Sequence, residues 1–226
     1  MSAFNFKIDA NPEFSFLTVD LPESETIKVE SAAMASMDTN LKMTVKASGG
    51  FKRFLTGENI FINEFQAQGG QGEISIAPGP SGDIVHQYID QDNTLYLSSG
   101  AFLASSKGVQ IDSKWQGMSK GFFSGGGFFL IKCSGVGDLW FNSYGAIFEV
   151  DVKGEYIVDT GHIMGFSSTL DYRISKVGGY KSLFFSGEGL VCRFSGEGKV
   201  WIQTKNPNSF VWWADAYRII QKRNSN

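Results

Sequence analysis

Three sequence motifs recur along this chain in a constant order, and this repetition constrains the fold more than any other feature. The first is a turn of small residues followed by an apolar residue, found at 31–34, 99–102 and 160–163. The second is an apolar pair before a hydroxyl–glycine turn, found at 54–58, 122–126 and 184–188. The third is a glycine turn, found at 71–73, 136–138 and 197–199. The spacings of 61 to 68 residues indicate a unit that was copied twice.

Within each unit the apolar pattern is typical of short β-strands. One strand-like run follows the second motif, at 59–65, 128–133 and 190–194, and another follows the third, at 73–76, 138–141 and 199–202. The few glycine-rich residues between the two runs predict a β-hairpin in each unit. The abundance of glycine (27) and phenylalanine (20) and the scarcity of proline (5) also suit strands joined by tight turns. The sequence therefore predicts an all-β fold of three pseudo-symmetric repeats, each a sandwich or barrel.

The motifs divide the chain into five segments. We predict an N-terminal strand or arm over 1–24, β repeats over 25–83, 84–145 and 146–206, and a C-terminal tail over 207–226. The longer first interval predicts a loop insertion near 79–83. In the tail, Pro207, Asn208 and Ser209 are typical of a helix start, and we expect a short helix from Phe210 to about Lys222.

Charge and hydropathy narrow the functional classes. The net charge of −3 gives no overall basic excess of the kind that nucleic-acid binders use. No window approaches 18 uninterrupted apolar residues, so no transmembrane helix is expected. Charged residues at positions 7, 9 and 13 argue against a signal peptide, and two cysteines do not form a disulfide framework. We therefore expect a cytoplasmic protein.

Several phrases of the second and third units resemble a known family. They are GAFLASS (100–106), SYGAIFEVD (143–151), VDTGHIMGF (158–166) and LFFSGEGLVCRFSGEGKVWIQT (183–204). These phrases are similar to the bacterial and archaeal family related to the yeast altered-inheritance-of-mitochondria (mitochondrial biogenesis) protein, in the superfamily likened to the trp RNA-binding attenuation protein (TRAP). The resemblance covers about 25–206. It implies repeats of the double-stranded β-helix type and no established chemistry.

Residues that carry chemistry in other proteins occur here without the necessary partners. Asp159-Thr160-Gly161 matches the aspartic-protease signature, but the other units have no second Asp-Thr-Gly to share a proton. The histidines, His86 and His162, and the two cysteines lack zinc-ligand spacing. At the positions equivalent to the cysteines, the neighbouring unit has Phe or Ile, which is typical of buried apolar residues. The glycine runs precede strands and not helices, which favours hairpin turns over phosphate loops. We expect no catalytic, cofactor or metal site, and no enzyme.

One pattern predicts a binding site. Before the second motif each unit has a glycine, a basic residue and bulky apolar residues. The residues are Lys52, Arg53 and Phe54 in the first unit, Lys120, Phe122 and Phe123 in the second, and Lys181, Phe184 and Phe185 in the third. If the units surround a pseudo-threefold axis, these loops meet at one end and bind an anion or a protein partner. The alternative is that the phenylalanines pack between units and the lysines are solvated.

These observations favour a non-catalytic binding or scaffold protein that associates with itself. Single-stranded RNA binding is the first alternative, by analogy with the TRAP fold, because aromatic platforms beside lysines stack bases. The acidic balance of the chain stands against it. The second is peripheral contact with a membrane surface through the Trp-rich tail. The partners expected are another copy of the chain, and an anion or protein at the Lys/Phe loops.

Overall fold

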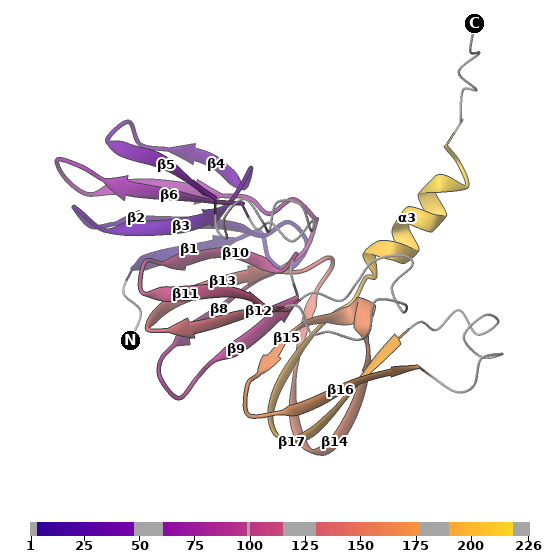
Figure 1. The fold of residues 1–226 in the computed structure, drawn as a ribbon. Coiled ribbons are helices and arrows are strands. Elements are labelled where there is room, and N and C mark those ends of the chain that lie inside the picture. The colour runs from indigo at the N-terminus through magenta and orange to yellow at the C-terminus, as the bar shows by residue number, and fades with distance from the viewer. Residues whose placement is uncertain (1–3, 48–60, 99, 115–129, 177–189, 219–226) are drawn as a thin grey trace, which may run out of the picture.

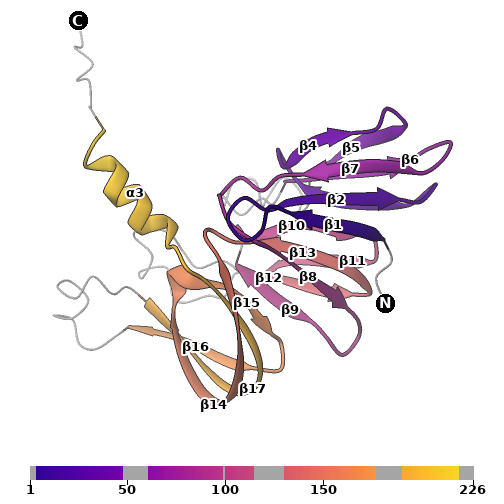
Figure 2. The same cartoon turned by 180° about the vertical axis from the view of Figure 1, so that it is seen from behind.

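The structure is a computed structural model that describes residues 4–47, 61–98, 100–114, 130–176 and 190–218. These residues form three antiparallel sheets and one short C-terminal helix (Figure 1). The predicted all-β class is confirmed. Each sheet is curled, and Figure 2 shows the same arrangement from behind.

The first unit has six strands in a fixed pairing pattern. Strand β6 lies between β5 and β3, and β7 lies between β4 and β2. A further strand, β1 (Asn5–Asp9), pairs with the other edge of β2. The six strands are β2 (Phe16–Leu21), β3 (Thr26–Glu30), β4 (Met34–Met37), β5 (Leu41–Ala47), β6 (Phe61–Ala67) and β7 (Gly72–Ile76).

The second unit repeats this pattern strand for strand. Strand β12 lies between β11 and β9, and β13 lies between β10 and β8. The order of pairing matches that of the first unit, with six added to each strand number. The six strands are β8 (Ile84–Ile89), β9 (Leu95–Ser98), β10 (Phe102–Ser106), β11 (Val109–Lys114), β12 (Leu130–Gly135) and β13 (Gly137–Asn142).

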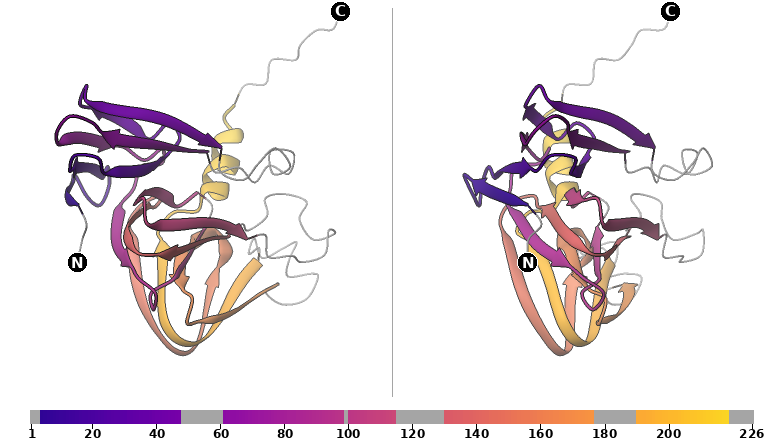
Figure 3. Two further views of the ribbon diagram at one scale, coloured as in Figure 1. Left: turned by 60° about the vertical axis from the view of Figure 1, so that its left-hand side comes forward. Right: turned by 90° about the vertical axis from the view of Figure 1, so that its left-hand side faces the viewer.

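The third unit has the same pattern, but two strand pairs are fused. Strand β14 (Ile147–Asp159) corresponds to β8 and β9, and β17 (Leu190–Gln203) corresponds to β12 and β13. The first part of β17 lies between β14 and β16 (Asp171–Lys176), and its second part lies between β14 and β15 (Ile163–Ser167). A 3₁₀ turn, η1 (Thr160–His162), joins β14 to β15. Both side views in Figure 3 show β14 and β17 curving together through this end of the molecule.

Small irregularities also occur at equivalent places in the three units, which supports the predicted triplication. The strand after the first motif has a register shift in each unit. In each unit the side chain two positions after the shift accepts a hydrogen bond from a backbone N–H of the neighbouring strand. Asp38, Ser106 and Ser167 accept hydrogen bonds from the backbone N–H of Glu73, Asp138 and Lys199 respectively. The shifts lie at Met34/Ser36, Phe102/Ala104 and Ile163/Gly165. The boundaries at 25, 84, 146 and 207 stay predictions. In the pairing pattern the first unit also includes β2, which lies before residue 25.

Neighbouring units share sheets. Strand β10 pairs with β3, which joins the second unit to the first in the six-stranded sheet β5-β6-β3-β10-β13-β8. Strand β15 pairs with β9, which joins the third unit to the second in the same way. The apolar core has three clusters, which contain the largest buried side chains, among them Trp140, Trp201, Phe65 and Phe166.

The predicted hairpins at the third motif are wrong. Strands β6 and β7 belong to different sheets, as do β12 and β13, and the equivalent residues of the third unit form the single strand β17. The glycines bend the chain from one sheet into the next. Gly154 (φ +96°) and Gly196 (φ +112°) lie opposite each other in β14 and β17, so this ribbon bends where both strands adopt a conformation that side chains disfavour. Within the described residues of the three units, the consecutive strands that pair with each other are β5–β6, β11–β12 and β16–β17.

The C-terminal helix is confirmed, but its limits differ from the prediction. Helix α3 spans Pro207–Asp215, with Asn206 as the N-cap accepting from the backbone N–H of Asn208. Proline at the first helical turn requires no hydrogen-bond partner for its nitrogen, so the helix begins there and not at Phe210. The helix ends before Arg218, and Lys222 lies outside the described residues. None of the helix's residues is buried.

Candidate functional site

The predicted Lys/Phe site lies outside the described residues. Its nine residues belong to segments 48–60, 115–129 and 177–189. The structure describes the strand pairs that flank these segments, namely β5–β6, β11–β12 and β16–β17. In both views of Figure 3 the three strand pairs end on the same side of the molecule. The anion or partner site itself stays a prediction.

The Asp-Thr-Gly sequence forms a structural turn. Asp159 ends β14, and one of its carboxylate oxygens accepts a hydrogen bond of 2.7 Å from the backbone N–H of Gly161. Thr160 donates from its hydroxyl to the carbonyl oxygen of Leu190 at 3.0 Å. Asp159 is the N-cap of the 3₁₀ turn η1, which follows β14 directly, so the interpretation as a strand-end turn is confirmed.

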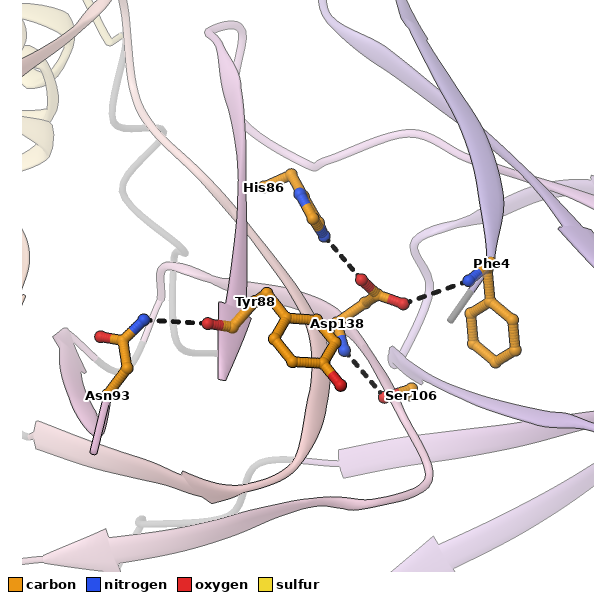
Figure 4. A network of polar contacts seen from close by, with 6 residues as sticks. All are labelled: Phe4, His86, Tyr88, Asn93, Ser106 and Asp138. Atoms are coloured by element: carbon orange, nitrogen blue, oxygen red, sulfur yellow. Dashed lines mark hydrogen bonds and ion pairs between the residues drawn. The ribbon is translucent and has the colours of Figure 1, made fainter. Parts of the chain in front are cut away.

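A His–Asp pair, which the sequence does not reveal, lies in the second unit, where the N-terminal segment contacts it. Asp138 at the start of β13 is fully buried, and its carboxylate is 2.8 Å from Nε2 of His86 on β8 (Figure 4). The same carboxylate accepts a hydrogen bond of 3.3 Å from the backbone N–H of Phe4. The hydroxyl oxygen of Ser106 accepts a hydrogen bond of 3.0 Å from the backbone N–H of Asp138. The pair therefore connects the N-terminal segment, β8, β10 and β13.

The surroundings of this pair are those of a structural contact. The ring of His86 packs against Phe6 and Trp140, with ring centroids 4.5 Å and 5.3 Å away. No nucleophilic side chain is hydrogen-bonded to His86 in the residues the structure describes. A catalytic triad requires a nucleophile within hydrogen-bond reach of the base. The pair is therefore best interpreted as a buried polar link.

The remaining histidine and both cysteines also have structural positions. Nδ1 of His162 hydrogen-bonds with the carbonyl oxygen of Gln203 at 2.8 Å. Cys133 and Cys192 are fully buried, and burial raises the pKa of each thiol to about 12. The interpretation of the cysteines as buried apolar residues is confirmed. Within the described part of the chain, no group of three His, Cys, Asp or Glu residues could hold a metal ion.

Glu30 is the described carboxyl group with a strongly changed acidity. It ends β3, directly before the first motif, where the other units have Ser98 and Asp159. Burial raises the pKa of Glu30 from 4.5 to about 7. This group therefore exchanges its proton near neutral pH, and its ionisation is coupled to folding.

A cavity of about 600 Å³ lies where the second and third units meet helix α3. The first motifs of both units contribute to it, together with the predicted loop insertion after β7 and the start of the helix. The part of its lining that the structure describes contains no charged side chain. Asn142, which is 1% exposed, also lines it, and neither polar atom of its amide has a hydrogen-bond partner among the described residues. The cavity suits an uncharged ligand with hydrogen-bonding groups. The lining includes Ser81, Ser98, Gly100, Thr160, Gly161, Gln203, Asn206 and Phe210.

Helix α3 presents a row of aromatic rings to solvent. Phe210 contacts Tyr144 of the body at a ring-centroid distance of 5.8 Å, and Trp213 contacts Phe210 at 5.9 Å. Tyr217 continues the row at 5.3 Å from Trp213. Trp212 and Tyr217 are each 73% exposed. Figures 1 and 2 show the helix projecting from the sheets.

Exposed apolar side chains also mark the two ends of the row of sheets. One group lies on β4 and β5, and the other lies on β14, at the opposite end of the molecule (Figures 1 and 2). The first group is Met37, Met43 and Val45. The second group is Phe148, Tyr156 and Ile157. We call them the β4 end and the β14 end.

Together these features define the class as an internally repeated all-β protein. The chain belongs to the mitochondrial biogenesis AIM24 family, whose model matches residues 6–205. This confirms the family predicted from the sequence phrases. None of the described helices is long and apolar enough to cross a membrane.

Two relatives support this assignment. A protein from Streptococcus pyogenes serotype M6, described as uncharacterized, is 29% identical over 219 residues, which is 91% of this chain and 88% of the relative. The crystal structure of a Streptococcus pyogenes protein has a TM-score of 0.82 and 28% identity, and the match covers 95% of this chain and all of that chain. Neither description states an activity.

Proposed function

We propose that this protein is a non-catalytic scaffold that associates with itself and binds other molecules on its surface. The observation that carries the proposal is the pair of apolar ends. Met37 and Tyr156 are 38% and 37% exposed, and Val45, Phe148 and Ile157 are 50% exposed or more. Soluble monomers rarely leave such groups of side chains uncovered on edge strands.

The polar residues support the same proposal from another direction. The buried His–Asp pair, the Asp159 turn and the two cysteines are all engaged in the fold. Reaction chemistry would instead need converging groups with a vacant position for substrate. A protein whose polar groups stabilise its modules and whose apolar side chains face outward is suited to assembly.

Light scattering over a wide concentration range tests the proposal. A molar mass above 24.8 kDa that rises with concentration is the expected result. A mass equal to one chain at all concentrations would remove self-association. Fluorescence polarisation with a single-stranded RNA at low and high salt should show no steep salt dependence. A steep salt dependence would favour the RNA-binding alternative, since phosphate contacts release counterions.

Helix α3 supports a second candidate function, contact with a membrane surface. Exposed Trp and Tyr side chains are typical of the membrane–water interface, where the ring is apolar and its polar atom is hydrated. Trp212, Trp213 and Tyr217 are the residues concerned. In vesicle co-sedimentation, the Trp212→Ala/Trp213→Ala variant should lose binding, whereas Phe148→Ala, which removes an exposed ring at the β14 end, should not. Equal binding by both variants would contradict this candidate.

A further inference from the structure

Units join inside this chain through one type of strand contact, which is used twice. The strand after the first motif of one unit pairs antiparallel with the strand before the first motif of the preceding unit. This contact is β10 with β3, and then β15 with β9. Each contact completes a composite sheet, made from three strands of one unit followed by strands of the next.

The two ends of the molecule carry the unused halves of the same contact. In the first unit the strand after the first motif is β4, and no described strand pairs with its outer edge. In the third unit the strand before the first motif is the second part of β14, whose outer edge is likewise unpaired in the described residues. The half-sheets β1-β2-β7-β4 and β16-β17-β14 are therefore the two components of a third composite sheet.

We infer that β4 of one copy pairs antiparallel with the second part of β14 of another copy. This inference rests on the proposed self-association and names its partner and geometry. The register follows from the internal contacts. Ser105 pairs with Lys28, and Phe166 pairs with Tyr96. Counting from the shared register shift and from the first motif, the equivalent pair is Met37 with Ile157 of the second copy.

The neighbouring pairs in this register are also complementary. Ala104 pairs with Val29 and Gly165 pairs with Leu97, so Ser36 takes the position opposite Val158 of the second copy. One step further along the strands, Asp38 takes the position opposite Tyr156. In these flanking pairs a small or polar residue, on β4 or directly after it, thus faces an apolar residue on β14, as in the flanking pairs of the two contacts inside the chain.

Exposure at these positions supports the inference. On the first strand of the contact, Ser105 and Phe166 are fully buried, but Met37 is 38% exposed. On the second strand, the position of Tyr156 is occupied in the other units by Ile27 and Leu95, which are also fully buried. Tyr156 is 37% exposed. The two ends therefore expose apolar side chains at positions that the chain buries wherever the contact forms.

The contact joins two different surfaces, so it is heterologous. Each copy keeps one β4 edge and one β14 edge available after pairing, and copies add head to tail into rings or filaments. Pairing the edges also satisfies the backbone groups of both strands, which removes two edges open to unspecific association.

Cysteine cross-linking between two populations tests the register. Met37→Cys protein and Ile157→Cys protein are mixed and oxidised mildly; directly opposite residues in an antiparallel pair have Cβ atoms about 4.5–5.5 Å apart. Because Cys133 and Cys192 are buried, the new thiols are the reactive ones in the described chain. A disulfide-linked dimer should form in the mixture. Val136→Cys, at an exposed turn away from both edges, replaces Ile157→Cys as the matched control and should give none.

The outcomes separate the pairing from the proposed function. Dimers from Met37→Cys protein alone would show β4 pairing with β4 and would overturn the head-to-tail contact. If the unmodified protein associates but the mixture of cysteine variants does not cross-link, the β4–β14 pairing is wrong and the proposed self-association stands. An unmodified protein that stays monomeric would overturn both.

Charge variants provide a test that does not depend on disulfide geometry. Met37→Lys/Ile157→Lys places like charges opposite each other and should weaken association more than about tenfold. Met37→Lys/Ile157→Glu should restore it. Both side chains are exposed in the single chain, so both variants should keep the thermal unfolding midpoint of the monomer. Equal association of the two variants would contradict the inferred register.

Discussion

The buried carboxylate of Asp138 offers a direct test of how the N-terminal segment is held against the second unit. Replacing it with asparagine keeps the shape of the side chain but puts an amide NH₂ group in place of one carboxylate oxygen. The two oxygens accept from the backbone N–H of Phe4 and from Nε2 of His86. In the Asp138→Asn variant, one of these donors therefore faces another donor in a site from which water is excluded.

The size of the effect follows from those contacts. A hydrogen bond to a charged group stabilises a protein by about 1.5–3 kcal/mol, and a buried donor left without a partner costs about 1–3 kcal/mol. We expect Asp138→Asn to lower the free energy of unfolding by about 2–3 kcal/mol. For a chain of this length, that corresponds to a midpoint about 4–12 °C lower.

A double-mutant cycle isolates the His–Asp contribution. His86→Phe removes the hydrogen bond but keeps a ring between Phe6 and Trp140. Urea unfolding of both single variants and the double variant should give a coupling energy of about 1–2 kcal/mol. A loss below about 0.5 kcal/mol in Asp138→Asn, or additive effects in the cycle, would refute the role assigned to this pair.

Three further predictions concern single side chains. Because burial raises the pKa of Glu30 from 4.5 to about 7, the free energy of unfolding falls as pH rises through that interval. The free energy of unfolding of Glu30→Gln should therefore be about 1 kcal/mol higher than that of the unmodified protein at pH 8, a value reduced for partial solvent screening, and equal to it at pH 4. The same difference in free energy of unfolding between the two proteins at pH 8 and at pH 4 would contradict the coupling of Glu30 ionisation to folding. Asn142→Leu should raise the unfolding free energy by about 1–3 kcal/mol, as its amide lacks partners; a loss of stability would reveal a partner in the cavity. Cys133 and Cys192 should resist alkylation at pH 8 until the chain unfolds, as measured by mass spectrometry.

The repeated β architecture could be predicted from the sequence because its motifs recur at nearly constant spacing. The direction that the chain takes at the glycine turns could not be predicted. Gly196 suits a tight hairpin as well as a bend within a strand, because both use a positive φ. The choice depends on distant partners: β17 continues through Gly196 because Gly154 of β14, 42 residues earlier, bends with it.

The candidate sites were harder to predict for the same reason. His86 and Asp138 are 52 residues apart and show no recognisable spacing. A weak signal was present, since Asp138, Glu73 and Lys199 occupy one position in the repeat, and His86 lies on β8, the strand that pairs with β13, opposite Trp140 and two residues from the partner of Asp138. The open edges of β4 and β14 have no sequence motif, because an edge is defined by what fails to pair with it. The helix start was misplaced because Asn206 supplies the cap, directly before Pro207, which is the first helical residue.

The fusion of strands in the third unit affects how each part of the chain can vary. In the first unit β6 and β7 are separated by residues 68–71, so the link between sheets can gain or lose residues without shifting either ladder. In the third unit β14 and β17 pair over 13 consecutive positions that run from one sheet layer into the other. One extra residue near 196–198 would turn every later side chain of β17 to the opposite face. Length variation should therefore be tolerated at the first bend and rejected at the third, and the third unit should exchange its amide hydrogens as a single block.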